Sequence, residues 1–82
     1  MFFVYAIQSL VKRRIYIGQT QDINKRLQYH NSGCVKSTSS DKPWELIAFV
    51  KVRSLNEASW IERELKKSNS KRIKWIELNS IV

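Results

Sequence analysis

The sequence contains little cysteine, proline, glycine or acidic side chain. Its 82 residues include one cysteine, Cys34, together with one histidine, one proline and two glycines. A single cysteine cannot form an internal disulfide, which favours a reducing compartment, and we expect the cytoplasm. One cysteine and one histidine also fall short of the four ligands of a structural zinc site. We therefore expect a fold that is held by its core alone.

Long hydrophobic runs are missing as well. The most apolar segment, residues 1–7, is short, has no basic stretch before it and is followed by Gln8. A membrane-spanning helix needs about 20 apolar residues, and a secretory signal carries basic residues ahead of its apolar region. The segment predicts neither, and we expect no membrane partner.

Positive charge is what the chain has in excess. Fifteen Lys and Arg stand against seven Asp and Glu, which gives a formal net charge of +8. Such a charge attracts a polyanion over long range, so nucleic acid is the first candidate partner. The alternatives are charge that serves solubility only, or an acidic protein partner. Length and a hydrophobic content of 43% predict one folded domain over residues 1–82, which we expect to be a monomer.

Three segments have the composition of β-strands. Residues 2–9 are almost continuously apolar, which is typical of a strand buried on both faces at the centre of a sheet. Residues 15–18 resume the pattern after a short charged segment, which indicates an antiparallel hairpin. Residues 44–52 predict a third strand. Its apolar residues are expected to share one face: Trp44, Leu46, Ala48, Val50 and Val52.

Helical spacing separates and follows these strands. Residues 22–31 predict a first helix, capped by Thr20 or Asp22 and ended by Gly33. Residues 33–43 are rich in Ser, Thr and Lys and predict an exposed loop.

A second helix is predicted after a capping box of Ser54 and Glu57, and it ends before Ser68. Its apolar stripe consists of Leu55, Ala58, Ile61 and Leu65. A short last helix over residues 70–77 is expected to turn Ile73 and Ile76 inward, with Trp75 at its side. The predicted fold class is α/β of the α+β type, a three-stranded antiparallel sheet flanked by helices in the order β-β-α-β-α-α.

Three polar side chains fall on apolar helix faces. Arg26 and His30 share an arc with Ile23 and Leu27, and Glu62 falls inside the stripe of the second helix. A charge that points toward a core needs a partner or a metal ion. The plainer interpretation is that Arg26 and Glu62 pair with each other and that His30 is structural.

The hairpin contributes two phenols. With an even loop, Tyr5 and Tyr16 lie on the same face of the sheet, and a four-residue loop places Tyr5 opposite Gly18. The missing side chain of Gly18 then leaves space for another group. Two ordinary sheet tyrosines packed against a helix are the alternative.

Taken together, these residues resemble the GIY-YIG endonuclease family. Val4-Tyr5-Ala6 and Tyr16-Ile17-Gly18 resemble its paired signature, although Val4 and Ala6 depart from the signature residues. The likeness continues through residues 20–27 and 30–33, Thr38, residues 43–46 and residues 58–66, so it covers nearly the whole chain. It is similar in this to the small stand-alone bacterial members, and it implies the GIY-YIG nuclease fold.

The resemblance implies an enzyme, a metal-dependent endonuclease that cuts a nucleic-acid phosphodiester, with DNA favoured. The catalytic positions that it implies are Tyr5, Tyr16, Arg26, His30 and Glu62. Glu62 would hold one Mg²⁺ or Mn²⁺, Arg26 would bind the scissile phosphate, and Tyr5 would act as the base. For that role we expect the Tyr5 phenol, close to Arg26 and to a metal ion, to ionise below its usual pKa of about 10, with His30 relaying the proton.

Nucleic-acid contacts are expected from basic residues late in the chain and at the hairpin tip. They are Arg63, Lys66, Lys67, Lys71, Arg72, Lys74, Lys12, Arg13 and Arg14. A protein partner is a further expected source of specificity. The alternatives to the enzyme are a binding module of the same fold without turnover and a basic protein-interaction domain.

Overall fold

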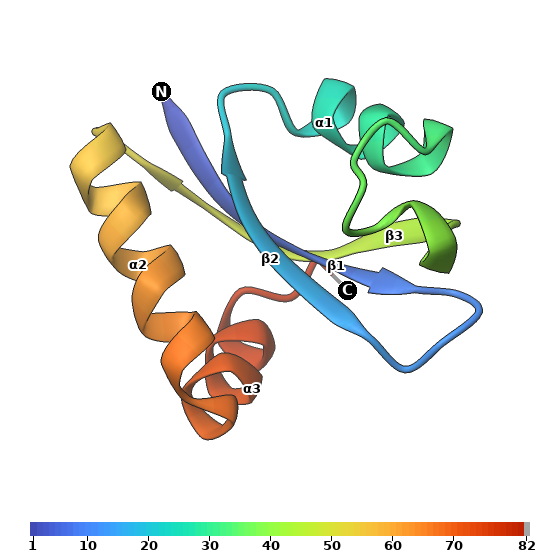
Figure 1. The fold of residues 1–82 in the computed structure, drawn as a ribbon. Coiled ribbons are helices and arrows are strands. Elements are labelled where there is room, and N and C mark those ends of the chain that lie inside the picture. Colours follow the sequence, from blue (N-terminus) through green and yellow to red (C-terminus); the bar gives the residue numbers. More distant parts are fainter. Residues whose placement is uncertain (82) are drawn as a thin grey trace.

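The computed structural model describes residues 1–81, which form one antiparallel sheet with helices on both of its faces (Figure 1). The strands are β1 (Phe2–Ser9), β2 (Ile15–Thr20) and β3 (Trp44–Val52), and the helices are α1 (Ile23–Ser32), α2 (Leu55–Lys67) and α3 (Asn69–Leu78). This order confirms the predicted α+β arrangement. A short 3₁₀ helix, η1 (Ser39–Asp41), lies between α1 and β3.

β1 is the central strand of the sheet, as predicted, and the strand order is β2-β1-β3. Tyr5 pairs with Gly18 and Ile7 with Tyr16, and the amide of Ser9 donates to the carbonyl of Arg14 at 3.0 Å. The hairpin loop therefore has four residues, and Tyr5 and Tyr16 are diagonal neighbours on one face. On the other edge of the sheet, residues 79–81 run beside β3 through a bridge between Ala48 and Ser80.

Each face of the sheet has its own apolar cluster. α1 covers the face on which Tyr5, Ile7 and Trp44 are buried, with Leu27 packed against them. α2 and α3 cover the opposite face (Figure 1). That second cluster contains Val4, Ala6, Ile17, Ala48, Val52, Ala58 and Leu65.

β3 contributes to both clusters because its alternation changes phase. Ala6 pairs with Ala48 but Ile7 pairs with Leu46, so the residue between them, Ile47, is an extra one. Such a bulge moves every side chain beyond it to the other face. The prediction that all five apolar residues of this strand share one face is therefore wrong. Trp44 lies on the α1 side, whereas Ala48 and Val52 lie on the α2 side.

The helix ends follow the capping residues of the sequence. The carboxylate of Asp22 accepts from the amide of Lys25 at 3.1 Å, and the hydroxyl of Ser54 accepts from the amide of Glu57 at 3.2 Å. Gly33 ends α1 with a left-handed φ of 84°, which glycine adopts without steric cost.

Two apolar residues of the helices are more exposed than predicted. Leu55 opens α2 ahead of the turn that packs on the sheet and is 53% exposed. Ile73 is 48% exposed because α3 packs through Trp75 and Ile76 instead. Within residues 1–81 no helix combines the length and the apolar character needed to cross a membrane.

Candidate active site

Tyr5 and Gly18 form the floor of the candidate site. A Cβ atom at Gly18 would lie 2.6 Å from the hydroxyl oxygen of Tyr5 and 3.1 Å from Cε2 of Tyr16. Both phenol rings therefore lean over the glycine, toward the β2 edge of the sheet. The space that a bare glycine was expected to leave is occupied by the hydroxyl of Tyr5.

His30, on α1, forms a hydrogen bond with this hydroxyl. The Tyr5 oxygen lies 2.9 Å from His30 Nε2, and His30 Nδ1 lies 2.8 Å from Oγ1 of Thr38. The Thr38 hydroxyl donates its one hydrogen to the carbonyl of Val35 at 3.3 Å, so it accepts from Nδ1–H. Nε2 then carries the lone pair, and Tyr5 donates to it. This arrangement fixes the tautomer of His30.

Burial controls the protonation of both groups. Burial and then the nearby Arg26 charge lower the pKa of His30 from 6.5 to about 4, so the ring is neutral near pH 7. Burial raises the pKa of Tyr5 to about 12, although Arg26 acts to lower it. The expectation of a lowered Tyr5 pKa is therefore wrong for these protein groups, because desolvation outweighs the neighbouring cation.

Arg26 is half-buried beside Tyr5 and His30 and acts electrostatically on both. Within residues 1–81 it forms no ion pair, and its Nε atom is buried without a hydrogen-bond partner. The alternative in which Arg26 pairs with Glu62 is therefore wrong. A half-buried guanidinium whose Nε–H has no partner in the protein is suited to an anion, since its planar fork matches phosphate and carboxylate oxygens.

Glu62 reaches the site from α2, on the other side of the β2 edge. Its Oε2 atom lies 2.9 Å from Nζ of Lys66, and the same ammonium is 5.7 Å from the ring centroid of Tyr16. The charge of Glu62 also acts on Tyr5 and contributes to its raised pKa. Tyr5, Tyr16, Arg26, His30 and Glu62 therefore surround one surface.

The residues around Glu62 suit one kind of metal ion. The described part of the chain has no group of three or more His, Cys, Asp or Glu placed to hold a metal. Mg²⁺ is commonly bound by one or two carboxylates, with water and substrate phosphate filling its other positions. Glu62, whose side chain is 22% exposed, fits this single-carboxylate mode. It does not fit an all-protein cage.

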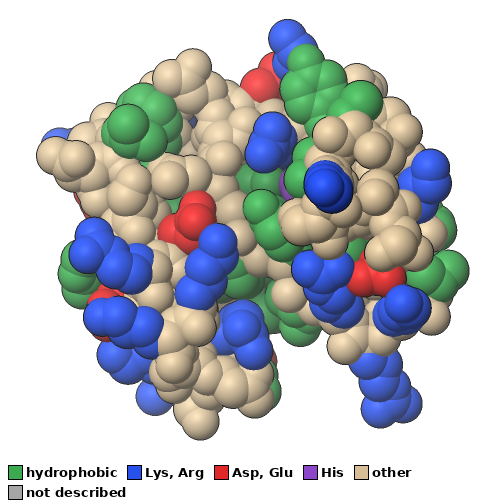
Figure 2. Space-filling model, in the orientation of Figure 1, with side chains coloured by type: hydrophobic (Ala, Val, Ile, Leu, Met, Phe, Trp, Pro, Cys, Tyr) green, Lys and Arg blue, Asp and Glu red, His purple; other side chains and the backbone are tan. Residues whose placement is uncertain are grey.

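The basic residues expected to contact nucleic acid differ in how they are already engaged. Lys12 and Arg14 pair with Asp41, Lys67 and Lys71 pair with Glu64, and Lys66 pairs with Glu62. Arg72 donates to Asn69 at 2.6 Å. Within residues 1–81 the cations without an ion pair or side-chain hydrogen bond include Arg13, Arg63 and Lys74. Figure 2 shows basic side chains on both sides of a furrow, with hydrophobic side chains and the histidine at its floor.

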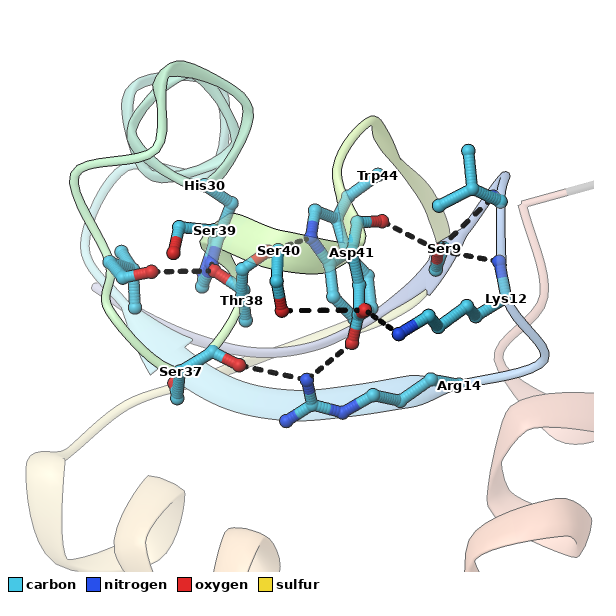
Figure 3. A network of polar contacts seen from close by, with 12 residues as sticks. Ser9, Lys12, Arg14, His30, Ser37, Thr38, Ser39, Ser40, Asp41 and Trp44 are labelled. Carbon is cyan, nitrogen blue, oxygen red and sulfur yellow. Dashed lines mark hydrogen bonds and ion pairs between the residues drawn. The ribbon is translucent and has the colours of Figure 1, made fainter.

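The segment 33–43 is partly buried, which corrects its prediction as an exposed loop. Thr38 is 0% exposed and Asp41 is 4% exposed. Asp41 binds the hairpin tip through Arg14 at 2.7 Å and Lys12 at 3.1 Å, and its carbonyl accepts from the Ser9 hydroxyl at 2.6 Å (Figure 3). Trp44 Nε1 donates to the carbonyl of Thr38 at 2.9 Å. These contacts hold the threonine against His30.

Sequence reasoning missed the role of Asp41. A signal was present, because Asp41 is the one carboxylate between residues 23 and 44, in a stretch that also carries four Lys and Arg. An isolated acid among basic residues favours an ion pair. Its partners on the hairpin tip, however, are set by tertiary packing.

The comparisons with known proteins identify the family of this chain. The GIY-YIG catalytic domain model matches residues 1–74 of the chain. The chain therefore belongs to the GIY-YIG family, a family of nucleases. A UPF0213 protein of Syntrophus aciditrophicus (strain SB) is 36% identical over 80 residues, which cover 94% of this chain and 91% of that protein.

Proposed function

We propose that this protein is a divalent-metal-dependent endonuclease that hydrolyses phosphodiester bonds of nucleic acid, with DNA as the favoured substrate. The observation that carries the proposal is the Tyr5–His30 hydrogen bond of 2.9 Å, with the unpaired Arg26 beside it and Glu62 across the β2 edge. A base, an anion receptor and a metal ligand are the three groups that phosphodiester hydrolysis needs. All three face one basic surface.

Tyr5 and His30 supply the proton path. The phenol oxygen takes a proton from the attacking water as it passes its own proton to the lone pair on His30 Nε2. With a Tyr5 pKa of about 12, this concerted route avoids a free phenolate. Thr38 keeps the Nδ1 proton in place, so the new proton enters at Nε2 only. A base within hydrogen-bond reach of its proton contributes about 10²–10⁴-fold to rate.

Arg26 supplies the phosphate site. Its unused donors bind the non-bridging oxygens of the scissile phosphate and stabilise the charge that gathers there in the transition state. A phosphate bound to Arg26 also offsets the positive charge that helps to hold down the pKa of His30. Substrate binding therefore makes His30 a better proton acceptor. Tyr16 orients the water or the phosphate through its hydroxyl.

Glu62 supplies the metal ligand. A bound Mg²⁺ or Mn²⁺ would support the leaving oxygen as a Lewis acid. The carboxylate is 22% exposed on α2, whereas Arg26 lies on α1, and the substrate phosphate would lie between the two. Cys34 is exposed and unpaired, which supports a reducing compartment such as the cytoplasm.

Glu62→Gln tests the proposal. The substitution keeps the size and hydrogen bonding of the side chain but removes the charge that holds a cation, so cleavage should fall at least 100-fold with the fold retained. The measurement is cleavage of duplex, branched and single-stranded DNA and RNA with Mg²⁺ or Mn²⁺. Binding of the same substrates should be unchanged or slightly tighter.

Glu64→Gln is the matched control. Glu64 lies on the same helix and is similarly exposed at 25%, but it pairs with Lys67 and Lys71 instead of the Lys66 that lies over Tyr16. It should cut at the wild-type rate. Two outcomes would contradict the proposed endonuclease activity and favour a binding module. One is a wild type that binds these substrates and cuts none, and the other is a Glu62→Gln variant that cuts as fast as wild type.

A further inference from the structure

Lys66 lies inside the proposed site, although the sequence places it in a run of surface lysines. Its ammonium is 2.9 Å from Glu62 Oε2 and 5.7 Å from the centroid of the Tyr16 ring. The next residue, Lys67, pairs instead with Glu64 at 3.3 Å. Two adjacent lysines of one helix therefore pair with different carboxylates. Only Lys66 pairs with Glu62, the proposed metal ligand.

We propose that Lys66 competes with the metal ion for Glu62 and moves to a substrate phosphate when the metal binds, so that it couples metal binding to nucleic-acid binding. This inference rests on the proposed function, because it takes Glu62 as the metal ligand. It adds that the metal and the nucleic acid bind cooperatively, through one named side chain.

Competition follows from charge. A divalent cation that binds Oε2 of Glu62 would lie within a few ångströms of the Lys66 ammonium, and like charges at that distance repel strongly. The two cations cannot hold one carboxylate oxygen together. Leaving is easy for Lys66, because the side chain is 49% exposed and a solvated i, i+4 pair on a helix is weakly held.

The released ammonium has a destination only when nucleic acid is present. Its four-carbon stem already extends over Tyr16, whose ring forms one wall of the furrow. A phosphate between Arg26 and Glu62 would lie within reach of that stem and would replace the lost carboxylate. Metal alone therefore has to displace Lys66 without compensation, whereas metal with nucleic acid does not. By linkage, each ligand must raise the affinity of the other by the same factor.

The first test measures Mn²⁺ binding to the protein without nucleic acid, by electron paramagnetic resonance of the free ion. Lys66→Met keeps the aliphatic stem and removes the competing charge, so Mn²⁺ should bind about three- to tenfold more tightly than to wild type. Lys67→Met removes the same charge one residue away and should change the affinity by less than about twofold. Lys66→Arg keeps a cation on Glu62 and should behave as wild type.

The second test measures coupling directly. In a Tyr5→Phe background, which lacks the phenol hydroxyl needed for cleavage, the affinity for a DNA duplex is measured with and without Mn²⁺. Replacing Lys66 by Met should reduce the gain in duplex affinity on adding Mn²⁺ by a factor of about three or more. The Lys67→Met variant should keep the full gain.

Equal Mn²⁺ affinity of wild type and Lys66→Met would overturn the inference, as would an unchanged gain in duplex affinity. Mn²⁺ that binds equally to Glu62→Gln would overturn the assignment of the metal ligand, and the inference with it. A failure confined to Lys66 leaves cleavage and its dependence on Glu62 intact, so the two proposals fail separately.

Discussion

His30 is fully buried, and both of its ring nitrogens are hydrogen-bonded. A buried imidazole in this setting resists protonation, and its pKa is lowered from 6.5 to about 4. This lowered pKa determines how the free energy of unfolding changes with pH. As the pH falls below 6.5, the unfolded chain takes up a proton on this histidine before the folded protein does, so protonation favours unfolding.

We therefore expect the free energy of unfolding to be highest above pH 6.5 and to fall as the pH drops toward 4. The loss amounts to about 3 kcal/mol at most, since one pKa unit corresponds to about 1.4 kcal/mol. Urea denaturation at a series of pH values measures it. His30→Gln should flatten this slope whatever its effect on stability at neutral pH. A wild type of constant stability between pH 6.5 and 4 would contradict the burial of a neutral His30.

Among the elements, the segment between α1 and β3 is held to the hairpin tip by one carboxylate. Asp41 accepts from Lys12 and Arg14, and these two cations lower its pKa below 3.8. Above pH 3.8 the ion pairs stabilise the fold, and this contribution disappears as the pH falls through the lowered pKa. The pH window of Asp41 thus lies below that of His30.

Asp41→Asn should lower the melting temperature by several degrees at pH 7, because it removes the charge from a side chain with two cationic partners. The difference between the variant and wild type should shrink as the pH falls below 3.8 through the lowered pKa of Asp41, since the wild-type carboxyl then loses its charge. Differential scanning calorimetry at pH 7 and at a series of lower pH values measures the difference. Glu64→Gln, which loses two more exposed pairs, should have a smaller effect. Equal melting temperatures at pH 7 would show that the segment is held by Trp44 and Ser9 instead.

The hairpin and the helix caps could be predicted because their signals are local. The hairpin follows from two apolar runs close together. Its register stays open because the turn has no Asn-Gly signal, and the pairing of Tyr5 with Gly18 is expected only for a loop of four residues. The caps follow from residue type, Ser54 for α2 and one of Thr20 or Asp22 for α1. The polar outliers Arg26, His30 and Glu62 could be found from helical angle alone. Each of these inferences uses residues within a few positions of one another.

Features that depend on distant packing could not be predicted. The bulge at Ile47 has no glycine or other marker in the sequence, and only the pairing with β1 defines it. The buried positions of Thr38 and Asp41 depend on contacts with residues 8 to 32 positions away. The direction of the Tyr5 pKa depended on burial, which helical and strand periodicity do not measure.

At the scale of the whole molecule, the net charge of +8 is not equally available to a ligand. The carboxylate of Asp41 offsets part of the positive charge of Lys12 and Arg14, whereas Arg63 forms no ion pair within residues 1–81. Arg63 is exposed and directly follows Glu62 on α2. Its contact with a phosphate would release a counterion in full.

Nucleic-acid affinity should therefore fall steeply with salt, and Arg63→Gln should reduce the slope of log affinity against log salt by about 1. Lys12→Gln should reduce it by less, since Asp41 already offsets part of the charge of Lys12 and Arg14. Fluorescence anisotropy with a labelled duplex across a salt series measures both slopes. Affinity that does not respond to salt would favour an acidic protein partner over nucleic acid.

The bulge in β3 has a consequence for how this chain tolerates changes in length. Trp44 lies opposite Ser9 on the α1 face, where its indole donates to the carbonyl of Thr38, and the extra residue at position 47 separates it from the α2-side residues of the same strand. Deleting Ile47 would leave Leu46 opposite Ile7 and Ala48 opposite Ala6 in regular alternation, so Trp44 would stay on the α1 face and Thr38 would keep its hydrogen bond. The loss would fall on the other face, where Ile47 packs against the α2 cluster and its carbonyl accepts from the amide of Ile81 at 3.3 Å. Ile47 is thus a position in β3 where one residue can be lost without changing the face that carries Trp44.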